Sequence, residues 1–198
     1  MSVATELPLS GVTVIDLTRV LAGPMCTQTL GDLGARVIKV EPRGTGDVTR
    51  MGGNRVGTIS AMYSSANRGK PSMAIDLSTP QGVEVIRRMA ESVDVVVQNF
   101  RPGAVERMGI GPDDLMAVNP DLIYVSISGF GPTGPYADGR VYDPIIQAIS
   151  GVVSTQQSRD IPIPDLVRTL ICDKTTAQAA AQAVTAALFA RERGAGGQ

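Results

Sequence analysis

The chain has 198 residues, of which 43% are hydrophobic and 19% charged, so it can bury a substantial core and need not be disordered. Its 18 basic and 19 acidic residues leave a net charge of -1, which excludes a general basic surface and argues against a nucleic-acid partner. The absence of histidine excludes serine–histidine and cysteine–histidine nucleophiles and most zinc sites, and no metal is expected.

No apolar run is long enough to span a membrane, and Met1 to Pro8 lack the basic and apolar regions of a secretory signal. We therefore expect one domain over residues 1–198, in a cytoplasmic protein without a membrane partner. Cys26 and Cys172 lie in apolar segments and are interpreted as small buried residues, and a disulfide between them is not needed in a reducing cytosol.

The chain begins with a strand–helix–strand pattern. Residues 12–17 form a β-branched run, and Ala22-Gly23-Pro24 then opens a helix that reaches about Leu33. Residues 36–41 form a second strand. The unit predicts a right-handed crossover and parallel pairing of the two strands.

Between residues 42 and 70 the periodic pattern is lost, and glycines alternate with arginines. A stretch of this length without periodicity is usually functional or mobile. Periodicity returns with a strand over residues 72–77 and with a helix capped by Ser78-Thr79-Pro80, whose inward side carries Val83, Ile86 and Ala90.

Further strands are predicted over residues 94–98 and 122–127, with a short helix over 112–118 between them. Strands separated by helices predict an α/β fold: a Rossmann-like, doubly wound, mainly parallel sheet with helices on both faces. Ligands of such sheets bind beyond the carboxyl ends of the strands, which here carry the loops 18–24, 42–50, 99–103 and 129–142.

The loop Gly129-Phe130-Gly131-Pro132-Thr133-Gly134 follows a strand and matches the letters of the dinucleotide fingerprint. Pro132 and Pro135 interrupt the entry into a helix, and no following strand supplies the ribose-binding acid, so a dinucleotide-dependent oxidoreductase is rejected. The segment is interpreted as a multiple-turn loop, from which a pocket could be lined by Tyr136, Arg140 and Tyr142.

A second loop, Asn99 to Gly109, follows another strand end and carries Phe100, Arg101 and Arg107. Arginine binds phosphate bidentately, and an aromatic ring can flank a planar base, so this loop could hold a nucleotide. On residue types alone, a turn with solvated charges is an equally balanced interpretation.

Asp173 stands near the start of the last long helix, whose apolar side is marked by Ala177, Ala181, Val184 and Leu188. An acidic residue there caps free backbone N–H groups at the positive end of the helix dipole. The dipole offers roughly 0.3–1 kcal/mol, less than one pKa unit, so it is expected to keep the carboxylate ionised. An ordinary helix cap therefore competes with a chemically active side chain.

Taken together, ordered blocks of the sequence resemble the family III CoA-transferases, a group that includes formyl-CoA transferase, carnitine CoA-transferase and the α-methylacyl-CoA racemases. The resemblance runs over almost the whole chain, and its blocks are residues 11–24, 34–42, Gly46-Asp47, Asn67-Arg68-Gly69-Lys70, Asn99-Phe100-Arg101-Pro102-Gly103 and Gly129-Phe130-Gly131. It implies the large α/β domain of that family and places Asp173 where the family carries its catalytic aspartate.

The resemblance implies transfer of CoA from an acyl-CoA donor to a free carboxylic acid, so that acyl-CoA and a small carboxylic acid are the binding partners. In family members the aspartate attacks the thioester carbonyl, which gives a mixed anhydride and the CoA thiolate. A carboxylate is ionised at neutral pH without a partner base, which suits a chain without histidine.

By the same resemblance, CoA should lie along the strand-end loops. Arg43 would reach the nucleotide phosphates, Asn99 and Phe100 would contact the cofactor, and Lys70 and Arg68 are further cationic candidates. Small residues permit close backbone approach to the pantetheine arm at Val20, Leu21 and Ala22. The site would be bordered by Arg107, Arg140 and Tyr142.

Two departures from the family pattern matter. Racemases of this fold place a histidine immediately before an aspartate in the region of Tyr142-Asp143, and the tyrosine here favours a transferase. Family chains are longer, with a small domain, a returning segment and a glycine-rich loop over the aspartate, and they form interlocked dimers. The resemblance thus implies the N-terminal half of a transferase, associated as a homodimer or with a separate C-terminal half. A non-catalytic CoA-binding or assembly module is the open alternative.

Overall fold

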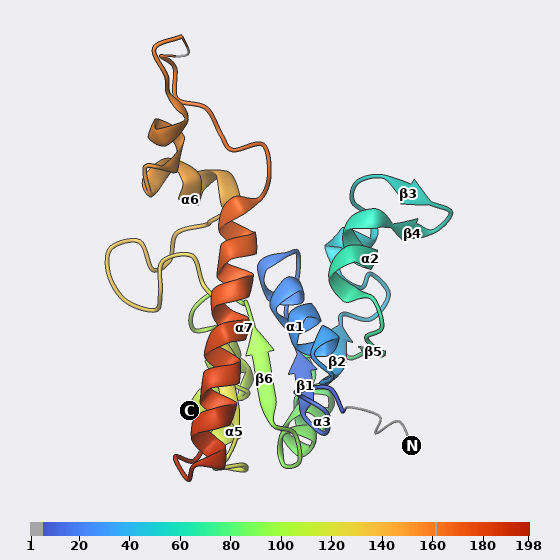
Figure 1. Ribbon diagram of the computed structural model, residues 1–198. Coiled ribbons are helices and arrows are strands. Elements are labelled where there is room, and N and C mark those ends of the chain that lie inside the picture. The colour runs from blue at the N-terminus through green and yellow to red at the C-terminus, as the bar shows by residue number, and fades with distance from the viewer. Residues whose placement is uncertain (1–5, 161) are drawn as a thin grey trace, which may run out of the picture.

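The computed structural model describes residues 6–160 and 162–198 (Figure 1). Residues 1–5, which belong to the stretch inspected for a secretory signal, lie outside the described residues. A five-stranded sheet with the order β5-β2-β1-β6-β7 forms the centre, and its neighbouring strands are all parallel. The strands are β1 Thr13–Asp16, β2 Arg36–Glu41, β5 Ser72–Ala74, β6 Val95–Gln98 and β7 Ile123–Ser126.

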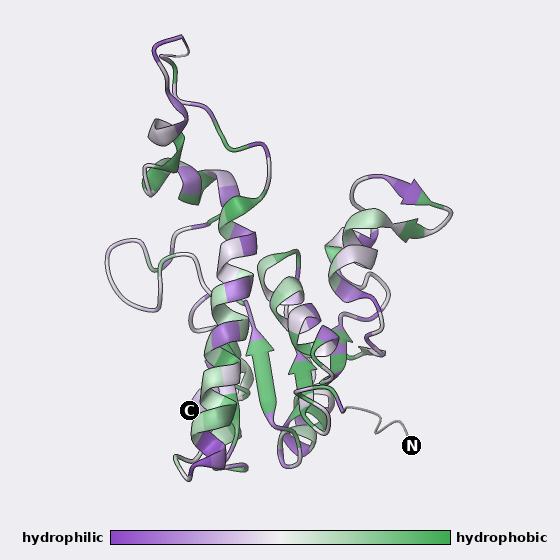
Figure 2. Cartoon of the chain, in the orientation of Figure 1, coloured by the Kyte–Doolittle hydropathy of each residue, from purple (hydrophilic) through white to green (hydrophobic). Residues whose placement is uncertain are grey.

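Helices cover both faces of this sheet, as the sequence predicts. Val14, Val95 and Val97 face a core shared with α1 (Ala22–Asp32) and α7 (Ile171–Glu192). Ile15 and Val96 point to the opposite face, where the core is closed by α3 (Pro80–Ala90), α4 (Ala104–Met108) and α5 (Pro112–Met116). Burial on both faces explains the near-continuous apolar strands, which Figure 2 shows in green. The doubly wound fold is confirmed.

The sequence shows no periodic pattern over residues 42–70, but the structure shows that the segment contains regular elements. It holds a 3-10 turn, η1 (Val48–Arg50), a hairpin of β3 (Arg55–Val56) and β4 (Ile59–Ser60), and the helix α2 (Ala61–Asn67). These elements are too short to show a period. They form the arm on the right of Figure 1.

Glu41, at the end of β2, fastens this arm to the sheet. Its carboxylate accepts hydrogen bonds from Arg50 Nε at 2.7 Å, Tyr63 Oη at 2.9 Å and the Asp47 amide at 2.8 Å, and also from the Ser72 hydroxyl at 2.6 Å. Its side chain is only 3% exposed. Side-chain hydrogen bonds therefore hold this arm on the sheet, whereas apolar contacts hold the helices that cover the sheet faces.

Further differences from the prediction concern the end of one strand and the segment after β7. The strand predicted over residues 72–77 ends at Ala74, because Asp76 turns the chain by accepting hydrogen bonds from the Ser78 amide and hydroxyl at 3.0 and 2.6 Å. A further helix, α6 (Asp143–Ile149), and the 3-10 turn η2 (Val152–Gln156) lie next to the start of α7 (Figure 1). We call the segment that contains α6 and η2 the second arm.

The 22 residues of α7 pack on the sheet through the predicted apolar side. Its first turn lies beyond the carboxyl ends of the strands (Figure 1). Within the part of the chain that the structure describes, no helix is both long and apolar enough to cross a membrane.

The Glu41 cluster predicts an acid-dependent loss of stability. Burial raises the pKa of Glu41, but the hydrogen bonds from Arg50, Ser72, the Asp47 amide and Tyr63 outweigh it and lower the pKa from 4.5 to about 2. A depressed folded-state pKa contributes stability above the unfolded value, and this contribution is lost as the pH falls from 4.5 toward 2. Urea unfolding between pH 6 and pH 3 tests this. At pH 6 the free energy of unfolding of Glu41→Gln should be lower than that of the wild type by roughly 2 kcal/mol, and it should change less with pH. Glu84→Gln, an exposed control, should follow the wild type.

Candidate functional site

The carboxyl edge of the sheet is organised around the turn between β1 and α1, residues 18–21, which we call the strand-end turn. Asn99, after β6, accepts a hydrogen bond from the Arg19 amide and donates one to the Arg19 carbonyl, both at 2.8 Å. The Lys39 ammonium donates to the Thr18 carbonyl at 2.9 Å. The turn is therefore held by side chains from both neighbouring strands.

Two buried ion pairs lie beneath this turn. Lys39 Nζ stands 3.2 Å from Asp47 Oδ2, and Lys70 Nζ stands 3.0 Å from Asp16 Oδ2, with all four side chains at most 2% exposed. Burial raises the pKa of Asp16, but Lys70 and Lys39, with hydrogen bonds from Thr18 and Thr27, hold it below the ordinary value. Asp16 is thus an ionised structural group.

The strand-end turn is strained. Val20 has a φ of 69°, the one positive φ of a non-glycine residue in the described part of the chain. A β-branched side chain in this region costs roughly 1–3 kcal/mol and persists only where its surroundings impose it. A Cβ added at Gly23 would lie 2.3 Å from the Thr18 Cβ. The backbone of α1 at Gly23 therefore packs directly against the Thr18 side chain of the turn. The sequence carries no sign of the Val20 conformation.

A cleft of about 450 Å³ opens beside the strand-end turn, at the carboxyl ends of β1, β2, β5 and β6. We call it the strand-end cleft. Leu17, Val40 and Ile75 contribute apolar surface, and Arg19 and Arg43 contribute cations. The Arg19 guanidinium lies 5.1 Å from the centre of the Phe100 ring. The remaining residues that line the strand-end cleft are Glu41, Pro42, Asp76, Leu77, Ser78, Phe100 and Met108.

The structure brings two of the predicted site residues to this cleft. Arg43 and Phe100 line it. Both polar groups of the Asn99 amide are engaged by the Arg19 backbone, so Asn99 shapes the turn. Arg107 is exposed on α4, and its Nη1 would lie 2.9 Å from a Cβ added at Gly103, so its guanidinium folds back over the loop after β6. Leu21 and Ala22 are buried at the start of α1.

Lys70 requires a correction. The sequence treats it as a candidate for binding cofactor phosphates, but its side chain is 2% exposed. Its ammonium donates to the Pro24 carbonyl and Thr27 Oγ1, both at 2.8 Å, and its other partners are Asp16 Oδ2 at 3.0 Å and Asn67 Oδ1 at 3.1 Å. A lysine has three donors, so none remains for a phosphate. Arg68 is instead exposed and paired with Asp32.

Arg140 and Tyr142 do not line the strand-end cleft. Both are exposed, Tyr142 to 70%, and they end the loop after β7, which projects from the body of the molecule in Figure 1. The glycine-rich motif leads through turns and reaches a helix only at Asp143, as the rejection of a dinucleotide fingerprint requires. A role for either side chain at a CoA site stays a prediction.

Asp173 lies on the first turn of α7 and is partly exposed. The prediction that it caps the helix is wrong, because α7 begins at Ile171 and the cap residue Leu170 offers no side-chain bond. The Asp173 amide is instead capped by the Asp143 carboxylate, with 2.9 Å from N to Oδ2. Burial, and then the negative charge of Asp143, raise the pKa of Asp173 above 3.8, against the direction expected from the dipole.

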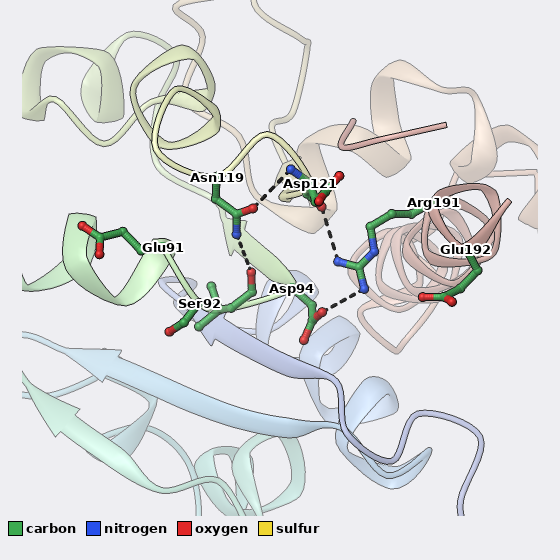
Figure 3. A pocket seen from close by; sticks show the side chains of 8 residues that line it. Glu91, Ser92, Asp94, Asn119, Asp121, Arg191 and Glu192 are labelled. Atoms are coloured by element: carbon green, nitrogen blue, oxygen red, sulfur yellow. Dashed lines mark hydrogen bonds and ion pairs between the residues drawn. The ribbon is translucent and has the colours of Figure 1, made fainter. Parts of the chain in front are cut away.

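A second hollow of about 460 Å³ lies at the opposite, amino-terminal ends of β6 and β7 (Figure 3). Arg191 of α7 donates to Asp94 Oδ1 at 2.8 Å and to the Asp121 carbonyl at 3.3 Å there. Asn119 ties the segment before β7 to the end of α3 through the Ala90 and Val93 carbonyls, both at 2.9 Å. These groups join α7 to the sheet, and the hollow lies away from the edge where such folds bind ligands.

Sequence reasoning missed Asp16, Lys39, Asp47 and Asp143. A charged residue inside an apolar strand, as at Asp16 and Lys39, is the signal that could have indicated buried pairing. Asp143 gave no such signal, because it begins a helix and does not interrupt an apolar strand.

Comparison with known proteins identifies relatives over nearly the whole chain. The family model described as CoA-transferase family III matches residues 9–198. Succinyl-CoA:glutarate CoA-transferase from Homo sapiens is 49% identical over 147 residues, which are 74% of this chain and 34% of that protein. Acetyl-CoA:oxalate CoA-transferase from Acetobacter aceti is 43% identical over 186 residues, which are 94% of this chain and 48% of that protein.

Among solved structures, a CAIB/BAIF family protein from Brucella suis matches with a TM-score of 0.91 at 40% identity, over 98% of this chain and 52% of that chain. The chain thus spans about half the length of this structure and half or less of the two curated relatives.

The burial of Lys70 predicts a large effect on stability. Lys70→Met should lower the free energy of unfolding by roughly 3–5 kcal/mol, because it leaves the buried Asp16 carboxylate without its nearest cation. Arg68→Met is the matched control, and it should change this energy by about 1 kcal/mol or less because the Arg68–Asp32 pair is exposed. Equal effects of the two variants in urea unfolding would contradict the structural role of Lys70.

Proposed function

The chain belongs to CoA-transferase family III, and from that membership we propose that it transfers CoA from an acyl-CoA donor to a free carboxylic acid, with Asp173 as the nucleophile. The observation that carries the assignment of the nucleophile is the environment of Asp173. Its carboxyl is partly exposed on the first turn of α7, beyond the carboxyl edge of the sheet, and forms no ion pair with any lysine or arginine that the structure describes. A carboxylate in that setting is reachable by a substrate and is not held by a cation that would have to be displaced.

In the proposed reaction, a carboxylate oxygen of Asp173 attacks the thioester carbonyl carbon of the donor. A C–O bond forms, the C–S bond breaks, and the CoA sulfur leaves as a thiolate with the electron pair. The acyl group is then held as an anhydride, which can exchange with a thiolate or with the carboxylate of the acceptor acid. No step requires an imidazole, and the chain contains no histidine.

We propose that the strand-end cleft binds the nucleotide part of CoA. Its cations, Arg19 and Arg43, suit phosphate groups, and the Phe100 ring offers an aromatic surface next to the Arg19 guanidinium. The nearby strand-end turn is rigid, which lowers the cost of ordering a ligand against its backbone.

The acceptor in this proposal is a small carboxylic acid. The relatives named above act on glutarate and oxalate, and this chain spans half or less of their length.

A covalent trap tests the nucleophile. The wild-type chain is mixed with a panel of acyl-CoAs and hydroxylamine, and peptide mass spectrometry should find a hydroxamate on the peptide that contains Asp173. Asp173→Asn should abolish the adduct, whereas Asp113→Asn, an exposed carboxylate on α5, should leave it unchanged. If no acyl-CoA gives an adduct while CoA still binds, the non-catalytic CoA-binding module becomes the better assignment.

Calorimetry tests the cleft. Arg43→Ala should raise the Kd for CoA roughly tenfold or more, because a charge-assisted hydrogen bond to phosphate is lost. Arg88→Ala, on the exposed side of α3, should bind like the wild type. Equal Kd values for wild type and Arg43→Ala would place the CoA phosphates elsewhere.

A further inference from the structure

The helix α6 meets the start of α7 through polar side chains. Asp143 and Gln147, four residues apart and therefore on one face of α6, are 4% and 1% exposed. On the other side of this short helix Ile145 and Ile149 are exposed to 39% and 60%. The polar side of α6 is thus buried and its apolar side exposed. Buried polar groups are costly without hydrogen-bond partners, so the side chains of Asp143 and Gln147 must find theirs in the segments that they contact.

Gln147 fixes the chain that leads into α7. Its Oε1 accepts a hydrogen bond from the Val167 amide at 2.9 Å, and its Nε2 donates to the Thr169 carbonyl at 3.3 Å. Nε2 also donates to Asp143 Oδ1 at 2.5 Å. The amide thus connects the segment before α7 to the Asp143 carboxylate.

Asp143 completes this connection. Its second oxygen, Oδ2, accepts a hydrogen bond from the Asp173 amide. This amide is one of the N–H groups at a helix start that have no partner within the helix. Within residues 6–160 and 162–198, no lysine or arginine forms an ion pair with Asp143. A buried carboxylate therefore faces the start of the helix with its charge uncompensated by a cation.

We propose that Asp143 is a positioning residue for Asp173: it fixes the backbone of the reacting residue, and its charge destabilises the ionised Asp173 carboxylate relative to the acylated form. This inference rests on the proposed function.

The charge effect follows from the balance of the acylation step. Before the step, Asp143 and Asp173 are two like charges joined through one hydrogen-bonded amide. When Asp173 Oδ bonds to the thioester carbon and the C–S bond breaks, the electron pair and the negative charge leave with the CoA sulfur. No proton moves, and Asp173 becomes neutral. The repulsion between the two side chains ends in this step, so Asp143 favours anhydride formation.

Two further ionisable residues, Cys172 and Lys174, adjoin Asp173 on its own helix. The pKa of the Cys172 thiol is raised by burial and then by Asp143 and Asp173, so the thiol stays neutral. The Lys174 ammonium donates to the Thr169 hydroxyl. Burial and Asp143 are therefore what raise the pKa of Asp173.

The test measures the pKa of Asp173 by carboxyl carbon NMR in the 198-residue chain, without any acyl-CoA. In the wild type it should lie above the ordinary 3.8. Asp143→Asn removes the charge while its amide oxygen can still accept the Asp173 N–H, and it should lower the pKa of Asp173 by roughly half a unit or more. Asp143→Glu, which keeps the charge, and Glu84→Gln, a remote loss of charge, should leave that pKa raised.

The second readout is the hydroxylamine trap. Asp143→Asn should form the Asp173 hydroxamate about three- to tenfold more slowly than the wild type, with partial recovery in Asp143→Glu. An unchanged Asp173 pKa and an unchanged trapping rate in folded Asp143→Asn overturn the proposal. A wild-type Asp173 pKa at or below 3.8 overturns it without any variant, even if Asp143→Asn does not fold.

Failure of the Asp143 proposal can be distinguished from failure of the proposed function. If the wild type forms no hydroxamate, the assigned reaction fails, and the Asp143 proposal fails with it as a statement about catalysis, whatever the NMR titration shows. If the wild type is trapped at Asp173 and Asp143→Asn matches it in both readouts, the Asp143 proposal alone is overturned.

Discussion

A buried carboxylate at the end of β1 is the constraint on which the carboxyl edge of the sheet depends. Asp16 uses one oxygen for the Thr18 amide, at 2.9 Å, and the other for Thr27 and Lys70, at 2.6 and 3.0 Å. An ion in such a place is tolerated only with all of its partners present. The strand-end turn, the first turns of α1 and the segment that carries Lys70 must therefore all reach their native positions for Asp16 to be stable in the interior. Val20, with its φ of 69°, lies in that turn next to the strand-end cleft.

The sequence predicts the central sheet well because each strand is fixed by its own residues. The βαβ unit, the strand that became β6 and the order of helices follow from apolar runs and from glycine and proline at their ends. The segment 42–70 was beyond the same reasoning, since its elements are held by Glu41 across the sheet edge and not by local periodicity. The length of β5 was missed for a similar reason, because the side chain of Asp76 ends it.

The candidate site divides in the same way. Arg43 and Phe100 could be predicted because strand-end loops converge in a parallel sheet. Lys70 was a candidate only through the family resemblance, and nothing local in the sequence shows that four acceptors surround its ammonium group. Asp173 was expected to cap its own helix, yet the cap comes from Asp143, which approaches only through the fold of the second arm.

Asp16 and Asp173 show how surroundings give one residue type two roles. Asp16 is enclosed by cations and hydroxyl donors that lower its pKa, so it is stable as an ion, and attack on an electrophile would cost all of those interactions. Asp173 stands beside another carboxylate and has a raised pKa, so the proposed acylation would remove an unfavourable charge. Environments that drive two carboxyl pKa values apart separate a structural acid from a reactive one. By this criterion, Asp173 is the better nucleophile of the two.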